Sequence, residues 1–279
     1  MTATETLMTG IALGESPRWH DGRLWFSDWG ANEVLAVGTD GTSEVVAQVK
    51  SFPLCIDRLP DGRLLIVDSE HGELLRREPG GELVRHADLR SVSDHPWNDI
   101  VVDGRGNAYV GAIGSIQGPQ PDGDILAVFT PDGRGRKVAD NLAFPNGMTI
   151  TPDGSTLIVA ESNAARLTAF DIDEDGGLSN RRVWADLGEN AAPDGICLDA
   201  ENAVWYADVP NQRCVRVREG GEVLATVDAD RGCFACELGG EDGRTLFVLA
   251  AEWPAAMEGE RRTGVLLTAG APAPRADRP

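Results

Sequence analysis

A chain of 279 residues is long enough for one large domain or two small ones, with a sizeable buried core. Hydrophobic residues make up 42% of it and charged residues 25%, the proportions of an ordinary soluble globular protein. The formal net charge of −20 argues against a broad basic face, so we expect neither nucleic acid nor a membrane surface among the partners.

The first residues and the cysteines predict where the protein works. The stretch MTATETLMTG has neither the basic nor the apolar region of a secretory signal, and no apolar run approaches the roughly 20 residues that cross a bilayer. An odd number of thiols without such a signal predicts the reducing cytoplasm. We expect the five cysteines to be small core residues, because no second pair completes a zinc site with the C-x-x-C motif. They are Cys55, Cys197, Cys214, Cys233 and Cys236.

Six copies of one sequence unit follow one another along the chain. Each copy reads as an apolar strand, a turn that usually carries Asp-Gly, and a second β-rich strand, which is a strong hairpin signal. The copies are, in order, ESPRWHDGRLWFSD from Glu15, CIDRLPDGRLLIVD from Cys55, NDIVVDGRGNAYVGA from Asn98, NGMTITPDGSTLIVAE from Asn146, DGICLDAENAVWYAD from Asp194 and CELGGEDGRTLFVLA from Cys236.

The spacing of the copies predicts the architecture. They start about 40 to 50 residues apart, which is the period of four-stranded propeller blades. Weaker strand candidates lie between them, such as EVLAVG at 33–38 and LTAFDI at 167–172. We therefore predict an all-β fold, one six-bladed β-propeller domain over residues 1–279, with a loosely ordered tail at about 271–279. A large β-sandwich is the alternative, but it gives no reason for a repeat of this length.

The first residues of the six copies should meet at one end of the central channel, because the innermost strand of each blade lines it. Four of the six carry oxygen donors, two of them carboxylates and two amides: Glu15, Asn98, Asn146 and Asp194. This set suits one hard divalent ion, Ca²⁺ above all, with Mg²⁺, Mn²⁺, Fe²⁺ and Zn²⁺ as alternatives. Zn²⁺ is less favoured because the set has no His or Cys. The competing interpretation is that these residues only form turns.

These motifs resemble the SMP-30/gluconolactonase (regucalcin-like) family, and the chain is identified as a bacterial member. The similarity rests on GESPRW at 14–19, NDIVVDGRGNAYV at 98–110, FPNGM at 144–148, PDGICLD at 193–199 and RTGVLL at 262–267. The resemblance implies a six-bladed propeller with a divalent metal held by Glu15, Asn146 and Asp194. Asn98 would be a fourth ligand or a substrate contact, and Asp194 also the general base or water-positioning carboxylate.

Two departures from the family concern the substrate. Sugar lactonases of the family often carry an Arg two residues before the Asn of the Asn-Asp motif, whereas Pro96 stands there in this chain. The segment 114–124, GSIQGPQPDGD, offers no acidic lid residue. We expect residues 95–98 and this segment to flank the metal, and the lactone to be smaller or more apolar than a sugar lactone. The expected substrate contacts are Asn98, His95, Trp97, Phe144 and Trp29. Blade packing is the alternative for the aromatic residues, and a surface loop for His95.

The sequence supports two classes of function. The first is a metal-dependent carboxylic ester hydrolase that opens a lactone, with the carbonyl polarised by the metal and Asp194 as general base. Asp99 is the second candidate for the base. A Ser nucleophile is not expected, because no G-x-S-x-G elbow occurs. The same site could instead hydrolyse an organophosphate or serve a rearranging enzyme. The second class is a non-enzymatic calcium-binding propeller or interaction module.

Overall fold

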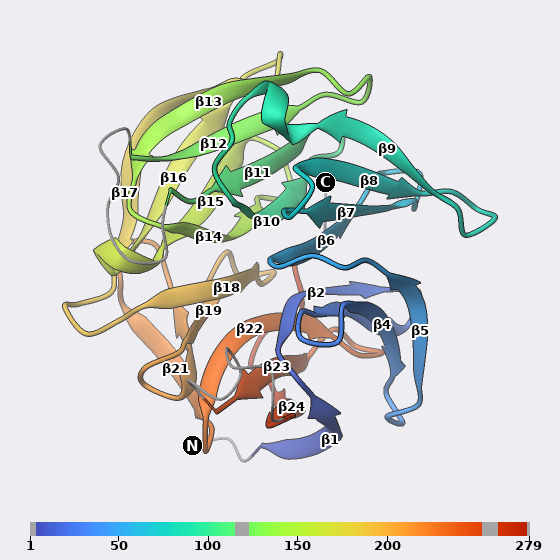
Figure 1. Cartoon of the computed structure of the whole chain (residues 1–279). Helices are drawn as coiled ribbons and strands as arrows, with labels where there is room; N and C mark the ends of the chain where they lie inside the picture. The colour runs from blue at the N-terminus through green and yellow to red at the C-terminus, as the bar shows by residue number, and fades with distance from the viewer. Residues whose placement is uncertain (1–3, 115–122, 253–261, 278–279) are drawn as a thin grey trace.

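The computed structural model describes residues 4–114, 123–252 and 262–277, and Figure 1 shows their strands as blades around a central channel. Within this part of the chain the strands form six antiparallel sheets of four strands each. The fold is therefore a six-bladed β-propeller, and this prediction is confirmed. In each blade the strand that begins a sequence copy is the innermost one. The described residues contain no helix that is long and apolar enough to cross a membrane.

The bounds of the elements follow the blades. Blades 1 to 3 comprise β2 (Gly14–His20), β3 (Arg23–Asp28), β4 (Glu33–Gly38) and β5 (Ser43–Gln48); β6 (Leu54–Arg58), β7 (Leu64–Asp68), β8 (Glu73–Arg77) and β9 (Leu83–Asp88); and β10 (Trp97–Val102), β11 (Ala108–Ala112), β12 (Asp124–Phe129) and β13 (Gly135–Leu142). Blades 4 and 5 comprise β14 (Pro145–Ile150), β15 (Thr156–Glu161), β16 (Arg166–Ile172) and β17 (Leu178–Asp186); and β18 (Pro193–Leu198), β19 (Val204–Asp208), β20 (Arg213–Val217) and β21 (Val223–Asp228). Blade 6 comprises β22 (Gly232–Gly239), β23 (Thr245–Ala251), β24 (Gly264–Gly270) and β1 (Glu5–Ile11), and the short 3₁₀ turns are η1 (Leu89–Ser91) and η2 (Ser162–Ala164).

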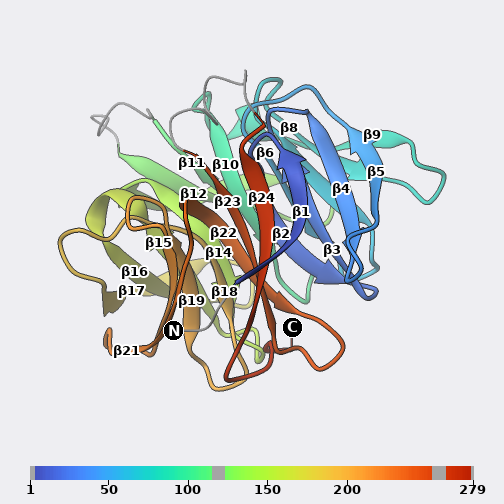
Figure 2. The same cartoon turned by 90° about the horizontal axis from the view of Figure 1, so that it is seen from below.

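The ring is closed by the two ends of the chain. The N-terminal strand β1 pairs antiparallel with β24, from Glu5 opposite Thr268 to Ile11 opposite Gly264. It is thus the outer strand of the last blade, and Figures 1 and 2 both show it beside β24. Joining the first strand to the last blade removes the seam at which a propeller would otherwise open. The sequence repeat did not assign this strand.

The Asp-Gly signals form the predicted hairpins. Between β2 and β3, His20 pairs with Arg23, and the two residues between them, Asp21 and Gly22, both have positive φ, at 50° and 72°. A two-residue hairpin loop needs this left-handed backbone at both positions, and Asp-Gly adopts it at low cost. The turn chemistry therefore sets the register in which the strand pair begins.

The interior is made of apolar residues between neighbouring blades, and all five cysteines belong to it. Each is a free, buried thiol, and Cys197, Cys214, Cys233 and Cys236 share one apolar cluster between blades 5 and 6. The prediction that the cysteines are small core residues is confirmed. Burial raises the pKa of Cys197 and Cys236, so these thiols stay protonated.

The described part of the C-terminal segment, residues 271–277, differs from the expected loose tail. Ala273 is fully buried and Ala276 is 6% exposed. The backbone N–H of Ala276 donates to the carbonyl oxygen of Leu198 over 3.1 Å. Small alanine side chains fit between the turns of neighbouring blades, and the backbone of the segment satisfies polar groups that those turns leave unpaired.

Candidate metal and substrate site

A cavity of about 120 Å³ lies at the end of the channel where the innermost strands begin. Its polar lining is the set of oxygen donors selected from the repeat, namely Glu15, Asn98, Asn146 and Asp194. The rest of its wall is apolar: Leu13, Trp29, Phe52, Pro53, Ile113, Phe144 and Phe234. The structure thus brings together four polar side chains that are up to 179 residues apart in the chain, from Glu15 to Asp194.

Each polar residue is the second residue of an innermost strand, in β2, β10, β14 and β18. The pairing of each of these strands shifts register at or directly after that residue, whereas β6 pairs regularly throughout. Such bulges change the direction in which a side chain points, and each of these lies beside a polar side chain that lines the cavity. Gly147, after Asn146, lets blades 4 and 5 approach, because a Cβ there would lie 2.5 Å from the carbonyl oxygen of Asp194.

Hydrogen bonds join the polar residues across the blades. The Nδ2 of Asn98 donates to the Oδ1 of Asn146 over 3.1 Å, and the Nδ2 of Asn146 donates to the Oγ of Ser162 over 3.3 Å. The hydroxyl of Ser162 in turn donates to the carbonyl oxygen of Pro193 over 2.6 Å, next to Asp194. This chain of bonds places the Asn146 amide between Asn98 and Asp194.

The electrostatics of the cavity favour a cation. Burial, and then the charges of Asp194 and Asp99, raise the pKa of Glu15 well above its usual value. Burial, and then the charge of Asp99, likewise raise the pKa of Asp194, although a hydrogen bond from the Asn146 side chain opposes this. Glu15 is 7% exposed and Asp194 is 9% exposed. Buried carboxylates whose pKa is raised by burial and by other carboxylates are stabilised in their charged form by a nearby cation.

The donor set fits a hard divalent ion. Two carboxylates and two amides line one cavity, and carboxylate and amide oxygens are the ligands of Ca²⁺ and related ions. Among the residues that the structure describes, no group of three or more His, Cys, Asp or Glu side chains could hold a metal ion. A metal at this cavity would therefore depend on the amide oxygens of Asn98 and Asn146 as well as on the carboxylates.

Asp99 lies beneath this cavity and does not line it. Its Oδ1 is 3.5 Å from the Nη2 of Arg18, and the Nε of Arg18 is 3.3 Å from Asp57. Burial raises the pKa of Asp99, although the charge of Arg18 and the Ile100 N–H oppose the rise. Asp99 therefore acts on Glu15 and Asp194 through its charge, from a buried ion-pair cluster in the channel.

The predicted substrate contacts divide into two groups. Trp29 and Phe144 line the cavity beside the polar residues. Trp97 does not, since it is 1% exposed and packs against Phe129 at a centroid distance of 5.7 Å, so the packing alternative applies. Side chains alternate along a strand, so Trp97, which precedes the inward-facing Asn98, faces the blade interior, whereas the register shift between Trp97 and Ile100 lets Asp99, which follows, turn towards the channel. His95 is half-buried and does not line this cavity.

The sixth equivalent position was assigned wrongly. Phe234 lines the cavity, whereas the Sγ of Cys236 lies in the core, 3.6 Å from the carbonyl oxygen of Gly195. The register shift of β22 lies between Cys233 and Ala235, so counting back from its Asp-Gly turn to Cys236 does not reach the residue that faces the cavity. Cys55 is also a core residue. Its pKa is raised by burial.

The sequence analysis missed five wall residues: Leu13, Phe52, Pro53, Ile113 and Phe234. One signal could have found Leu13, which stands two residues before Glu15 just as the predicted Phe144 stands two residues before Asn146. Apolar residues at that offset form the rim of the cavity. Residues 115–122 of the expected lid segment lie outside the described part of the chain; Asp124, which follows, accepts a hydrogen bond from Gly114 N over 2.6 Å.

A larger cavity of about 600 Å³ adjoins the first over blades 4, 5 and 6. The two cavities share Phe144, Asn146, Asp194 and Phe234 as lining residues. The polar site is therefore open on the side of these blades to a space large enough for a small molecule.

Fold and site together define a class of protein: a six-bladed propeller that carries a cavity of carboxylates and amides at one end of its channel. The sequence model of the family described as SMP-30/Gluconolactonase/LRE-like region matches residues 13–252. This protein belongs to that family.

Individual relatives are distant in sequence. Regucalcin from Danio rerio is 26% identical over 261 residues, covering 86% of this chain and 83% of that protein. Pentonolactonase XacC from Haloferax volcanii is 26% identical over 274 residues, covering 95% of this chain and 91% of that protein. The solved structure of a calcium-binding protein, regucalcin, from Agrobacterium tumefaciens aligns with a TM-score of 0.79 at 22% identity, covering 100% of this chain and 98% of that one. This last similarity shows the shared fold.

Proposed function

We propose that this protein is a metal-dependent hydrolase that opens a small lactone. The observation that carries the proposal is the meeting of Glu15, Asn98, Asn146 and Asp194, from four blades, in one cavity with an apolar wall. Membership of the family, and the pentonolactonase and gluconolactonase names of similar proteins, support this class of reaction.

Glu15, Asn146 and Asp194 would hold the metal, and Asn98 would assist directly or through its bond to Asn146. Oxygen-only donors favour Ca²⁺, in line with the calcium-binding relative of known structure. When bound, the ion supplies a Lewis acid for the lactone carbonyl and its developing negative charge.

Asp194 is the proposed general base. Asp194 lines the cavity beside the other candidate ligands, and the Asn146 side chain orients its carboxylate by a hydrogen bond. Asp194 would accept the proton of the attacking water as the water adds to the carbonyl carbon. Asp99 is the second candidate, but its contact with Arg18 and its place beneath the lining make it a supporting charge.

The wall of the cavity selects the substrate. In the part of the chain that the structure describes, no Arg or Lys lines the smaller cavity, where Leu13, Trp29, Phe144 and Phe234 surround the polar residues, and Arg231 lines only the larger one. An apolar wall of this kind favours a simple or alkyl-substituted lactone over a polyhydroxylated one. The partner is thus a small molecule, and nothing in the proposal needs nucleic acid or a membrane.

The test is a panel of lactones and one phosphotriester, assayed with metal-stripped protein to which Ca²⁺, Mg²⁺, Mn²⁺, Fe²⁺ or Zn²⁺ is restored in turn. We expect lactone hydrolysis that appears only with metal. A non-enzymatic calcium-binding propeller predicts metal binding without turnover of any compound, and an organophosphate hydrolase predicts highest activity on the phosphotriester. Either result would replace the proposal.

A further inference from the structure

Three buried carboxylates occupy the same place in three blades, and they are not among the residues of the proposed metal site. Asp28, Glu161 and Asp208 each end the second strand of a blade and are at most 1% exposed. Each pairs across the sheet with the residue that precedes a candidate metal ligand. The pairs are Gly14 with Asp28, Pro145 with Glu161 and Pro193 with Asp208.

These carboxylates, here called the anchor carboxylates, accept hydrogen bonds from backbone N–H groups just before the candidate ligands. The donors lie two or three residues upstream of Glu15, Asn146 and Asp194. The bonds run from Ala12 and Leu13 to Asp28 at 3.0 Å each, from Ala143 to Glu161 at 2.8 Å, and from Ala192 to Asp208 at 3.2 Å. A charged acceptor makes such bonds stronger than those between neutral groups.

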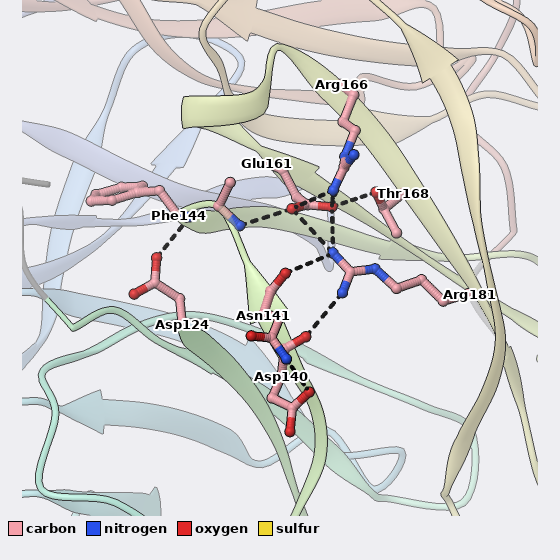
Figure 3. A network of polar contacts seen from close by, with 9 residues as sticks. Asp124, Asp140, Asn141, Phe144, Glu161, Arg166, Thr168 and Arg181 are labelled. Atoms are coloured by element: carbon pink, nitrogen blue, oxygen red, sulfur yellow. Dashed lines mark hydrogen bonds and ion pairs between the residues drawn. The ribbon is translucent and has the colours of Figure 1, made fainter. Parts of the chain in front are cut away.

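Two of the anchor carboxylates are held in place by arginines, and the third, Asp28, also accepts a hydrogen bond from the N–H of Ala31 over 3.3 Å. Figure 3 shows Glu161 bound by Arg166 at 3.0 Å, by Arg181 at 3.2 Å and by the Thr168 hydroxyl. Asp208 is bound by the Nε of Arg213 at 3.1 Å. Because the arginines fix the orientation of Glu161 and Asp208, these two carboxylates can impose a position on the backbone that they bind.

The segment before Asn146 has an unusual backbone conformation at Phe144, next to a residue that an anchor carboxylate binds. Phe144 has a φ of 62°, in the left-handed region that bulky side chains rarely adopt. Its N–H donates to Asp124 over 2.7 Å, next to the bond from Ala143 to Glu161 (Figure 3). A strained residue of this kind persists only where the surrounding structure over-determines it, and here two carboxylates hold consecutive N–H groups.

The other blades supply the contrast. Asp68 ends the second strand of blade 2, and the innermost strand of this blade carries no candidate ligand. Asp68 binds the N–H of His71 at 3.1 Å and the His71 ring. Blade 3 has Ala112 at this place, opposite Trp97. Backbone anchoring by the paired carboxylate therefore coincides with the blades that carry Glu15, Asn146 and Asp194.

We propose that Asp28, Glu161 and Asp208 are positioning residues that fix the backbone before Glu15, Asn146 and Asp194 and so preorganise the site for a divalent cation. The inference rests on the proposed metal-dependent function. Groups that orient metal ligands without touching the metal contribute strongly to affinity, typically about 10- to 100-fold. A geometry held by three such carboxylates leaves the ligands little freedom to lose when the ion binds.

The experiment measures the affinity of the metal-stripped full chain for Ca²⁺ and for Mn²⁺ by calorimetric titration. Asp28→Asn and Asp208→Asn keep the shape of the side chain and remove its charge, and Asp68→Asn is the matched control. We expect the first two variants to bind at least one of these ions about 10- to 100-fold more weakly, and the control to match the unsubstituted protein. Circular dichroism and a thermal melt identify folded variants, and either anchor variant alone suffices for the comparison.

The outcomes separate this inference from the proposed function. If the unsubstituted protein binds neither ion, the metal site is wrong and the inference falls with it. If it binds but folded anchor variants bind equally well, or Asp68→Asn weakens binding as much, only the positioning role is overturned. Glu161→Gln extends the test to the third blade, with the same expected loss.

Discussion

The side-chain amide of Asn98 donates a hydrogen bond of 3.1 Å to the amide oxygen of Asn146, from blade 3 to blade 4. An amide oxygen has two lone pairs, so Asn146 can accept this bond and still bind a cation. Asn98 would then support the metal through Asn146 as well as by contact.

This arrangement predicts unequal effects of removing the two amides. Asn98→Ala should weaken Ca²⁺ binding by about 10-fold, because it takes away a supporting group, and Asn146→Ala should weaken it further, because it takes away a ligand. Calorimetric titration of metal-stripped protein measures both. Equal losses in the two variants would mean that Asn98 is as much a ligand as Asn146.

Removing the Asp194 carboxylate should abolish the metal site. Asp194→Ala deletes one of the two carboxylates that line the cavity, so we expect no stoichiometric divalent metal in elemental analysis of the purified variant. The β-rich circular dichroism spectrum should not change, because no blade depends on this side chain for its strand pairing. Full metal occupancy in a folded Asp194→Ala protein would refute the ligand assignment.

Asp194→Asn separates catalysis from metal binding. The amide keeps the shape and one oxygen donor but cannot accept the proton of the attacking water. We expect weakened metal binding and a loss of about 2 to 4 orders of magnitude in kcat at saturating metal, the usual scale for a general base. Asp99→Asn should cost less, because Asp99 lies beneath the lining. Near-normal turnover in Asp194→Asn would move the role of base elsewhere, to Asp99 first.

The apolar wall predicts the order of substrates. Simple or alkyl-substituted lactones should give higher kcat/KM than gluconolactone, because no Arg or Lys among the described residues lines the smaller cavity beside the polar set, and Arg231 lines only the larger adjoining cavity. Phe234→Ala should lower kcat/KM for an alkyl-substituted lactone by about 10-fold or more, with a smaller effect on the unsubstituted ring. Gluconolactone as the best substrate of a panel would contradict the prediction.

Glu161 predicts a pH-dependent contribution to stability. Burial by itself raises the pKa of Glu161, but hydrogen bonds from Thr168 and the Ala143 N–H and the charges of Arg166 and Arg181 outweigh it, so the pKa lies below its usual value. A carboxylate with a lowered pKa in the folded state stabilises the fold above its unfolded pKa, about 4.3. That contribution is lost as the pH falls through the folded value.

The corresponding experiment compares Glu161→Gln with the unsubstituted protein in the presence of a chelator. We expect a loss of about 2 kcal/mol in the free energy of unfolding at pH 7, since hydrogen bonds to a charged group are lost. The difference should shrink as the pH is lowered below about 4. Urea melts at several pH values measure it, and Glu189→Gln, at an exposed position, is the control. A pH-independent difference would show that the charge of Glu161 is not what stabilises the fold.

The sequence by itself determined the architecture and the polar half of the site. The hairpin signal is local, since Asp-Gly turns and apolar strands need only neighbouring residues, and its sixfold recurrence implies a six-bladed ring. The same recurrence aligns Glu15, Asn98, Asn146 and Asp194, because equivalent positions in radial repeats must meet near the axis.

The tertiary structure decided the rest, because it depends on contacts between distant segments. Trp97 packs inside the blade and Phe234 takes the place expected for Cys236, since strand face and register are settled by pairing across the sheet. Closure of the ring by β1 needs the two chain ends to meet. The bonds from Asp28, Glu161 and Asp208 to the backbone before the candidate ligands join residues 15 to 18 positions apart, a relationship that no short motif encodes.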